Sequence, residues 1–322
     1  MKTGTPGTGG TAGTTWLRLG ISTALVAWIF YRAPLGEILT AFRAADLRFV
    51  WLALAINPLA YLASIRRWRL LIRAQGGDAS LSYLLRSFLA GVFFNNLLPS
   101  TVGGDALRAL DTARLGLGKV KGAAVVFVDR FVGALALLLF ATAGLLVSGR
   151  LTARIPALYG WVLGGAGAAA LAAILLLSAR VGEIVALRGR GGLLARALLW
   201  SLLLQTQVVL NGFLLARALH VAIPLPYFFL IVPLVLFVMM LPVSINGIGV
   251  RESAWVFFLA PFGVPAATAV AVAWLDYGLL LLQAAVGGVV YLRGHRRAGR
   301  VEPPPSRPDP PLLETGSSGL VS

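Results

Sequence analysis

The sequence predicts an all-α integral membrane protein, on three observations. Hydrophobic residues make up 58% of the 322 positions. Charged residues make up only 12%, against about 25% in soluble domains. Several apolar runs also reach or approach the roughly 20 residues that a helix needs to cross the hydrocarbon core. The chain is therefore divided into membrane spans rather than soluble domains.

Six unbroken apolar segments are expected to be full transmembrane helices. They run approximately over residues 16–31, 49–72, 122–147, 157–178, 197–219 and 265–292. Two further apolar segments are interrupted. Residues 84–110 contain Pro99, Gly103 and Gly104, and residues 227–262 contain Pro242, Gly247 and Gly249. Because Pro removes a backbone donor and Gly relaxes the turn, each break predicts two half-helices.

The distribution of Arg and Lys predicts how the chain crosses the membrane. Basic clusters flanking membrane spans usually lie in the cytoplasm. All of them do so here if both termini are cytoplasmic and both broken segments are re-entrant hairpins that enter from opposite faces, and this is the predicted topology. Eight full crossings with the same termini are the alternative. The expected location is the cytoplasmic membrane of a bacterium or archaeon. Residues 1–15 and 294–322 are expected to be disordered cytoplasmic tails, the second basic and then rich in Pro, around a membrane domain over residues 16–293.

The two broken segments resemble each other. Leu98-Pro99 through Gly103 to Arg108 aligns with Leu241-Pro242 through Asn246 to Arg251 at a constant offset of 143 residues. With the opposed entry predicted above, this similarity indicates an inverted-topology repeat, with halves at about 47–147 and 197–293.

Each break predicts a site for an anion. A helix that starts after a Gly-rich turn presents free N–H groups and the positive end of its dipole. Arg108 and Arg251 follow, and a guanidinium binds phosphate or carboxylate with two hydrogen bonds. The candidate headgroup-binding residues are Arg108, Arg251, Gly103, Gly104, Asn246, Gly247, Gly249 and Asn96.

Several other charges fall inside the predicted helices, where charge is costly unless paired or hydrated. They are Asp105, Asp129, Arg130, Glu252 and Asp276. These residues are either functional or structural, as in an Asp129–Arg108 or Asp276–Arg251 pair. Arg108 also fits a salt ladder spaced i, i+3 with Asp105, Asp111 and Arg114. Arg251 and Glu252 lie about 100° apart on a helix and need different partners, which we expect on another helix or in water. Gln205, Gln207 and Asn211 are expected to join neighbouring helices.

The composition excludes several classes of function. The absence of Cys excludes disulfides and thiolate metal sites, and two distant His residues argue against a metal centre, so no metal or cofactor is expected. A net charge of +16 would suit a nucleic-acid binder, but the basic residues flank apolar runs, as in membrane proteins. No Walker A motif is present, so the use of ATP by this chain alone is not expected.

Three blocks carry a family resemblance. FFNNLLPSTVGGDALR at 93–108, VDRFVG at 128–133 and LPVSINGIGVRESA at 241–254 resemble the signature of the lysylphosphatidylglycerol synthase transmembrane region, or flippase-like family. The resemblance runs from the first span to Tyr291 and does not extend to the soluble aminoacyl-transfer domain of the best-known members. It implies translocation of an anionic or aminoacylated phospholipid, with membrane lipids, a second copy or a lipid-modifying enzyme as partners. A transferase acting on a lipid-linked substrate and a non-transporting scaffold are the alternatives.

Overall fold

The computed structural model describes residues 9–97, 103–147, 157, 160–162, 164–165, 168, 191–240, 244 and 247–295. The described part is helical and contains no strand. Its first half comprises α1 (Gly9–Arg32), α2 (Leu35–Arg43), α3 (Leu47–Ala74), α4 (Leu81–Leu97), α5 (Gly103–Thr112) and α6 (Gly118–Val147). Its second half comprises α10 (Gly191–Ala218), α11 (Leu225–Met240), α12 (Val250–Leu259) and α13 (Ala266–Val290). The short helical turns Ala113–Leu117, Ala260–Phe262 and Tyr291–His295 follow α5, α12 and α13.

Four helical stretches of the described chain are long and apolar enough to cross a membrane. They are Leu47–Ala74, Gly103–Leu146, Gly191–Ala218 and Ala266–Arg293. A fifth qualifies if Leu19–Arg32 and Leu35–Arg43, which meet at a 70° bend, form one broken span. The chain is thus a multi-pass α-helical membrane protein, as predicted. The expected span at 157–178 lies largely outside the described residues.

Each interrupted apolar segment forms two helices, as predicted from its Pro and Gly residues. The first segment forms α4 and α5, and the second forms α11 and α12. Before α12, Gly247 and Gly249 have φ of +76° and +82°, a left-handed region that side chains disfavour. The backbone N–H of Gly249 donates to Oε2 of Glu252 over 2.8 Å. Glu252 therefore caps its own helix, which corrects the expectation of a partner on another helix.

Arg69 and Arg73 at the end of α3 hold the turn that follows. Both guanidinium groups donate to the carboxylate of Asp78, with Nε–Oδ1 distances of 2.9 and 3.1 Å. These bonds hold the pKa of Asp78 well below its usual range, the bonds from Arg73 contributing most. The clamp therefore persists as the pH falls through the ordinary carboxyl range.

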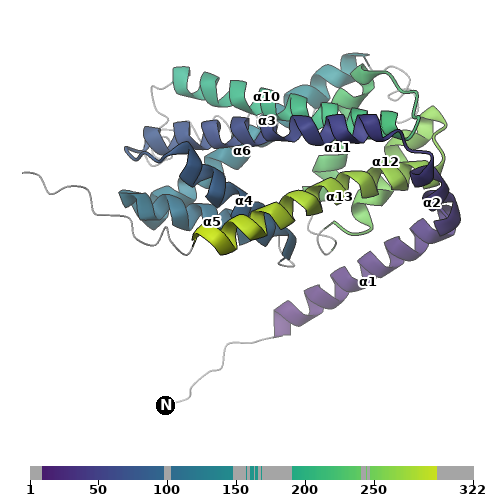
Figure 1. Ribbon diagram of the computed structural model, residues 1–322, viewed down its shortest axis with the longest axis horizontal. Helices are drawn as coiled ribbons and strands as arrows, with labels where there is room; N and C mark the ends of the chain where they lie inside the picture. Colours follow the sequence, from purple (N-terminus) through teal and green to yellow (C-terminus); the bar gives the residue numbers. More distant parts are fainter. Residues whose placement is uncertain are drawn as a thin grey trace, which may run out of the picture.

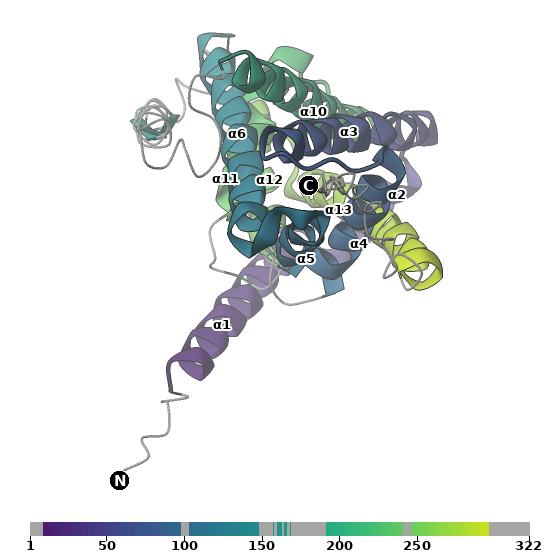
Figure 2. The ribbon, with the colours of Figure 1, turned by 90° about the vertical axis from the view of Figure 1, so that its left-hand side faces the viewer.

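The long helices form one bundle, from which α1 projects in both views (Figures 1 and 2). The most extensive packing joins α3 to α10, α4 to α13 and α6 to α11. The larger core lies between α10, α11, α12 and α13, around Phe228, Leu230 and Phe258. A smaller core surrounds Trp68 of α3, which is completely buried and packs with residues of α4 and α6.

Two glycines lie at close helix crossings. A Cβ on Gly144 of α6 would lie 2.7 Å from the backbone N of Leu230 on α11. A Cβ on Gly287 of α13 would meet the carbonyl oxygen of Leu89 on α4. Since these obstacles are backbone atoms, which cannot rotate away, only glycine fits at either crossing without a shift of the helices.

We expect Gly287→Ala to destabilise the protein, because the added methyl overpacks a backbone contact, at a cost of about 1–3 kcal/mol. Gly278→Ala is the matched control on the same helix, since a Cβ there meets nothing within 4 Å. Thermal unfolding in detergent checks both variants. An unchanged Tm for Gly287→Ala would contradict the close crossing of α4 and α13.

Candidate functional site

A cavity of about 300 Å³ lies inside the bundle, at the level of the first break. The described residues that line it come from α3, α4, α5, α6, α10 and the end of α11. Its polar lining comprises Ser64, Arg67, Asn95, Asp105, Arg108, Asp129, Arg130 and Gln205. Five of these residues carry charge, a density that is costly inside a membrane protein and marks a candidate site.

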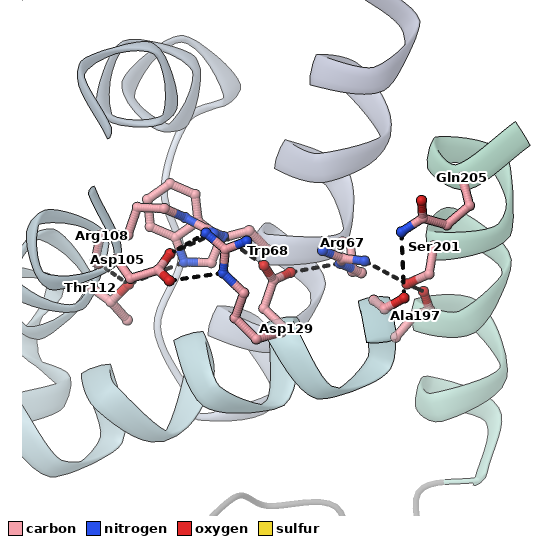
Figure 3. Close-up of polar contacts among 11 residues, drawn as sticks. Arg67, Trp68, Asp105, Arg108, Thr112, Asp129, Ala197, Ser201 and Gln205 are labelled. Carbon is pink, nitrogen blue, oxygen red and sulfur yellow. Dashed lines mark hydrogen bonds and ion pairs between the residues drawn. The ribbon is translucent and has the colours of Figure 1, made fainter. Parts of the chain in front are cut away.

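The centre of the site is a buried triad of two arginines and one aspartate (Figure 3). Asp129 on α6 accepts from Nε of Arg67 on α3 over 2.6 Å and from Nη2 of Arg108 on α5 over 3.0 Å. Arg67 also donates to Oγ of Ser201 on α10 over 2.6 Å. Only 6%, 6% and 1% of the side chains of Arg67, Arg108 and Asp129 are exposed. The triad therefore ties four helices together and leaves one buried positive charge in excess.

A stack of polar and aromatic contacts fixes Arg108. Its guanidinium carbon lies 4.5 Å from the ring centroid of Trp68, in cation–π geometry. Trp68 donates from Nε1 to Oγ1 of Thr112, which in turn donates to the carbonyl oxygen of Arg108. Nε of Arg108 is buried and has no hydrogen-bond partner among the described residues. Arg108 is therefore held in place while keeping a free donor.

A second ion pair lies beside the triad. Arg130 on α6 donates through Nε and Nη2 to both oxygens of Asp105 on α5, over 2.8 and 2.6 Å. Asp105 also lies 3.8 Å from Nη1 of Arg108. The side chains of Arg130 and Asp105 are 57% and 23% exposed, in contrast to the triad. This pair thus joins the buried charges to the more exposed side of the cavity.

The backbone at the start of α5 brings these charges close to α4. A Cβ on Gly104 would meet the carbonyl oxygen of Gly91, so glycine permits the approach. The N–H of Gly104 donates to Oδ1 of Asn95 over 2.7 Å, which satisfies one free group of the helix start. Asn95 lines the cavity, whereas Asn96 donates to the carbonyl oxygen of Val92 in its own helix. Gly103 opens α5.

Arg251 lies in a second polar cluster, among α10, α12 and α13. It is 4% exposed, and its guanidinium carbon lies 4.3 Å from the ring centroid of Tyr277. Asp276 lies close enough to Arg251 for electrostatic attraction, but within the described residues Arg251 forms no ion pair and its Nε has no hydrogen-bond partner. Asp276 instead accepts from Nδ2 of Asn211 over 3.2 Å.

The Gly-rich turn before α12 lies beside this second cluster. A Cβ on Gly247 would lie 3.9 Å from Nη2 of Arg251. A Cβ on Gly249 would lie 2.7 Å from Cβ of Leu25 on α1, so this glycine permits α1 to approach the turn. Asn246, the other residue of the turn predicted to bind a headgroup, lies outside the described residues.

The structure shows which of the contacts predicted from the sequence form. The Asp129–Arg108 pair forms, as do two of the three i, i+3 contacts of the ladder, Asp105–Arg108 and Asp111–Arg114. The Asp276–Arg251 ion pair, the structural alternative for these two residues, does not form among the described contacts, and Asp276 accepts from Asn211 instead. The three amides of α10 do join helices, through Gln205 to Gly133, Gln207 to Asn57 and Asn211 to Asp276.

Arg67 is a site residue that the sequence prediction missed. In the sequence it stands among Arg66, Arg69 and Arg73, a cluster typical of the cytoplasmic flank of a span. The helical period could have identified Arg67 as buried. It lies four residues from both Ala63 and Leu71, which are buried on the same face of α3.

A bundle of apolar helices around a buried, positively charged cavity defines a polytopic membrane protein with an internal polar site. Within the described residues, no three His, Asp or Glu side chains gather as a metal site would require. Residues 15–287 match the family described as the lysylphosphatidylglycerol synthase TM region, and the chain belongs to this family. This confirms the resemblance carried by the three sequence blocks. A comparison with curated proteins finds no match. Membership of the family indicates a membrane function related to lipids.

Proposed function

We propose that this protein binds a lipid with an anionic headgroup in the cavity around Arg108 and moves it between the two leaflets. The observation that carries the proposal is the charge of the cavity. Its described lining contains three guanidinium groups, of Arg67, Arg108 and Arg130, and two carboxylates, of Asp105 and Asp129. The excess positive charge is buried, and an anionic headgroup would neutralise it.

A correspondence between the helices of the two halves supports movement rather than binding alone. The helices α3, α4, α5 and α6 begin 144 to 148 residues before α10, α11, α12 and α13, respectively. The packing of α4 on α13 corresponds to that of α11 on α6 when the halves are exchanged. Gly144 and Gly287, at these two crossings, are themselves 143 residues apart.

This relation favours the inverted repeat, with Arg108 and Arg251 as equivalent anchors that serve opposite leaflets. Repeats of this kind support alternating access in transporters, in which one half rocks against the other around a central site. In this proposal the broken segments are re-entrant and both termini are cytoplasmic. The lipid is the partner in this proposal. A buried excess of positive charge suits the binding of an anionic lipid, whereas a purely structural scaffold would not require it.

Lipid exchange between leaflets tests the proposal. We expect proteoliposomes containing this protein to exchange fluorescent phosphatidylglycerol faster than protein-free vesicles. Arg108→Gln should lower the rate about tenfold, since one charged hydrogen bond contributes about 1.5–3 kcal/mol, while Arg67 and Arg130 remain in the cavity. The fold should survive, because Asp129 keeps its 2.6 Å bond to Arg67.

Arg86→Gln is the matched control, an exposed arginine on α4 that does not line the cavity. Its exchange rate should equal that of the wild type. Exchange of phosphatidylglycerol at the protein-free rate by the wild type, or at the wild-type rate by folded Arg108→Gln, would contradict the proposal.

A further inference from the structure

Two buried polar atoms, one donor and one acceptor, belong to residues that line the cavity and have no hydrogen-bond partner in the part of the chain that the structure describes. Nε of Arg108, on α5, is a donor, and Oε1 of Gln205, on α10, is an acceptor. The two residues are 5% and 6% exposed, and both line the cavity. Figure 3 shows them on opposite sides of the polar network, with Asp129 and Arg67 between them.

Such atoms are uncommon in folded proteins. A buried donor or acceptor that loses water and gains no hydrogen bond destabilises the folded state. Arg108 and Gln205 therefore complement a ligand that presents an acceptor at one end and a donor at the other. A phosphodiester supplies the acceptor, and a hydroxyl or ammonium group beyond it supplies the donor.

Gln205 is able to turn its oxygen towards such a donor. Its Nε2 donates to the carbonyl oxygen of Gly133 over 3.4 Å, beyond the usual range for this bond. The terminal torsion of a glutamine is broad, so the amide turns at little cost. A Cβ on Gly133 would lie 3.4 Å from Nη1 of Arg67, which places the Gln205 contact beside the triad.

The charge and the size of the cavity limit the anionic part of the ligand. The charges of the five charged residues in the described lining sum to +1, which one phosphodiester neutralises. A diphosphate carries more negative charge than this net positive charge can neutralise. A volume of about 300 Å³ lies at the lower end of ligand pockets, which suits one small headgroup.

We propose that Gln205 determines specificity, so that the cavity selects phosphodiester headgroups that also carry a hydrogen-bond donor. The inference rests on the proposed function, since it assumes that a lipid headgroup enters this cavity. The phosphate lies towards Arg108 and Arg130, and the hydroxyl or ammonium group lies towards Gln205.

Binding of four short-chain lipids to the purified protein in detergent, measured by titration calorimetry, tests this selection. Phosphatidylglycerol and phosphatidylmethanol form one pair, which differs by hydroxyl donors. Phosphatidylethanolamine and phosphatidylcholine form the other, which differs by ammonium donors. In at least one pair the wild type should bind the donor-bearing lipid about five- to tenfold more tightly, as expected for one hydrogen bond. The pair that shows the preference identifies the donor.

Gln205→Leu should reduce that ratio of affinities to about one. Gln207→Leu is the control on the same helix, because Gln207 bonds to Asn57 over 3.3 Å and does not line the cavity. It should keep the wild-type ratio. A ratio that survives Gln205→Leu, or that Gln207→Leu abolishes equally, would overturn the assignment of specificity to Gln205.

The same titrations separate failure of this inference from failure of the proposed function. Equal binding of all four lipids by the wild type, with loss in Arg108→Gln, would overturn the inference alone. Binding of none of the four would overturn the proposed function and the inference together.

Discussion

Asp129→Asn should be the most destabilising single change in the first half of the bundle. The carboxylate is 1% exposed and bonds to two buried guanidinium groups, so its removal takes the counter-charge from Arg67 and leaves Arg108 with Asp105 alone, 3.8 Å away. Breaking a buried ion pair in this way costs about 3–5 kcal/mol. Titration with sodium dodecyl sulfate in mixed micelles, followed by circular dichroism, measures the loss in the free energy of unfolding.

A second substitution tests the charge argument directly. Arg67→Met combined with Asp129→Asn leaves only Arg108 charged in the triad, which restores the original excess of one positive charge. This double variant should recover about half of the lost stability, since Ser201 keeps its bond to the carbonyl oxygen of Ala197. No recovery would mean that the geometry of the carboxylate, rather than its charge, holds the helices together.

Asp78→Asn serves as the control for an exposed aspartate with two arginine partners. Its clamp with Arg69 and Arg73 lies at the surface, where water and salt weaken ion pairs, so we expect only a small change in stability. Both carboxylates contact two guanidinium groups, so a difference in the loss of stability between Asp78→Asn and Asp129→Asn reports the effect of burial.

The fold was predictable from the sequence wherever hydrophobic length and backbone chemistry decide the structure. The apolar runs predicted α3, α6, α10 and α13 to within a few residues, since a helix satisfies its own backbone in lipid. The Gly and Pro residues located both breaks for the same reason. The first span proved less simple, because α1 meets α2 at a 70° bend that no residue count reveals.

The candidate site was less predictable, because its pairs depend on how helices face one another. The sequence suggested Asp129 with Arg108, yet Arg67 entered the site from a cluster that resembled a flank. Arg66 and Arg67 are neighbours with opposite fates, one exposed and the other buried. Periodicity alone distinguishes them only when the buried face of α3 is already known. An ion pair of Asp276 with Arg251 was one alternative, whereas the structure gives Asp276 a hydrogen bond from the amide of Asn211 on α10.

The double variant Arg251→Met, Asp276→Asn should reduce lipid exchange to the rate of protein-free vesicles without destabilising the protein. Arg251 is buried, forms no ion pair with a described residue, and lies near the charge of Asp276. Replacing both charges together removes their desolvation cost, and such replacements are often neutral or stabilising by about 1–4 kcal/mol. The side chain of Met also retains contact with the ring of Tyr277.

The proposed two-site mechanism therefore predicts that the double variant loses lipid exchange but keeps its stability. Arg251→Met alone should unfold more easily, because it leaves Asp276 buried without its cation, and the double variant should recover. Exchange of phosphatidylglycerol in proteoliposomes and unfolding in mixed micelles supply the two readouts. Since a transporter must release its lipid on the far side, loss of the second anchor should stop the cycle even with the Arg108 cavity intact. Wild-type exchange by a stable double variant would instead restrict Arg251 and Asp276 to packing, and would leave one headgroup site rather than two.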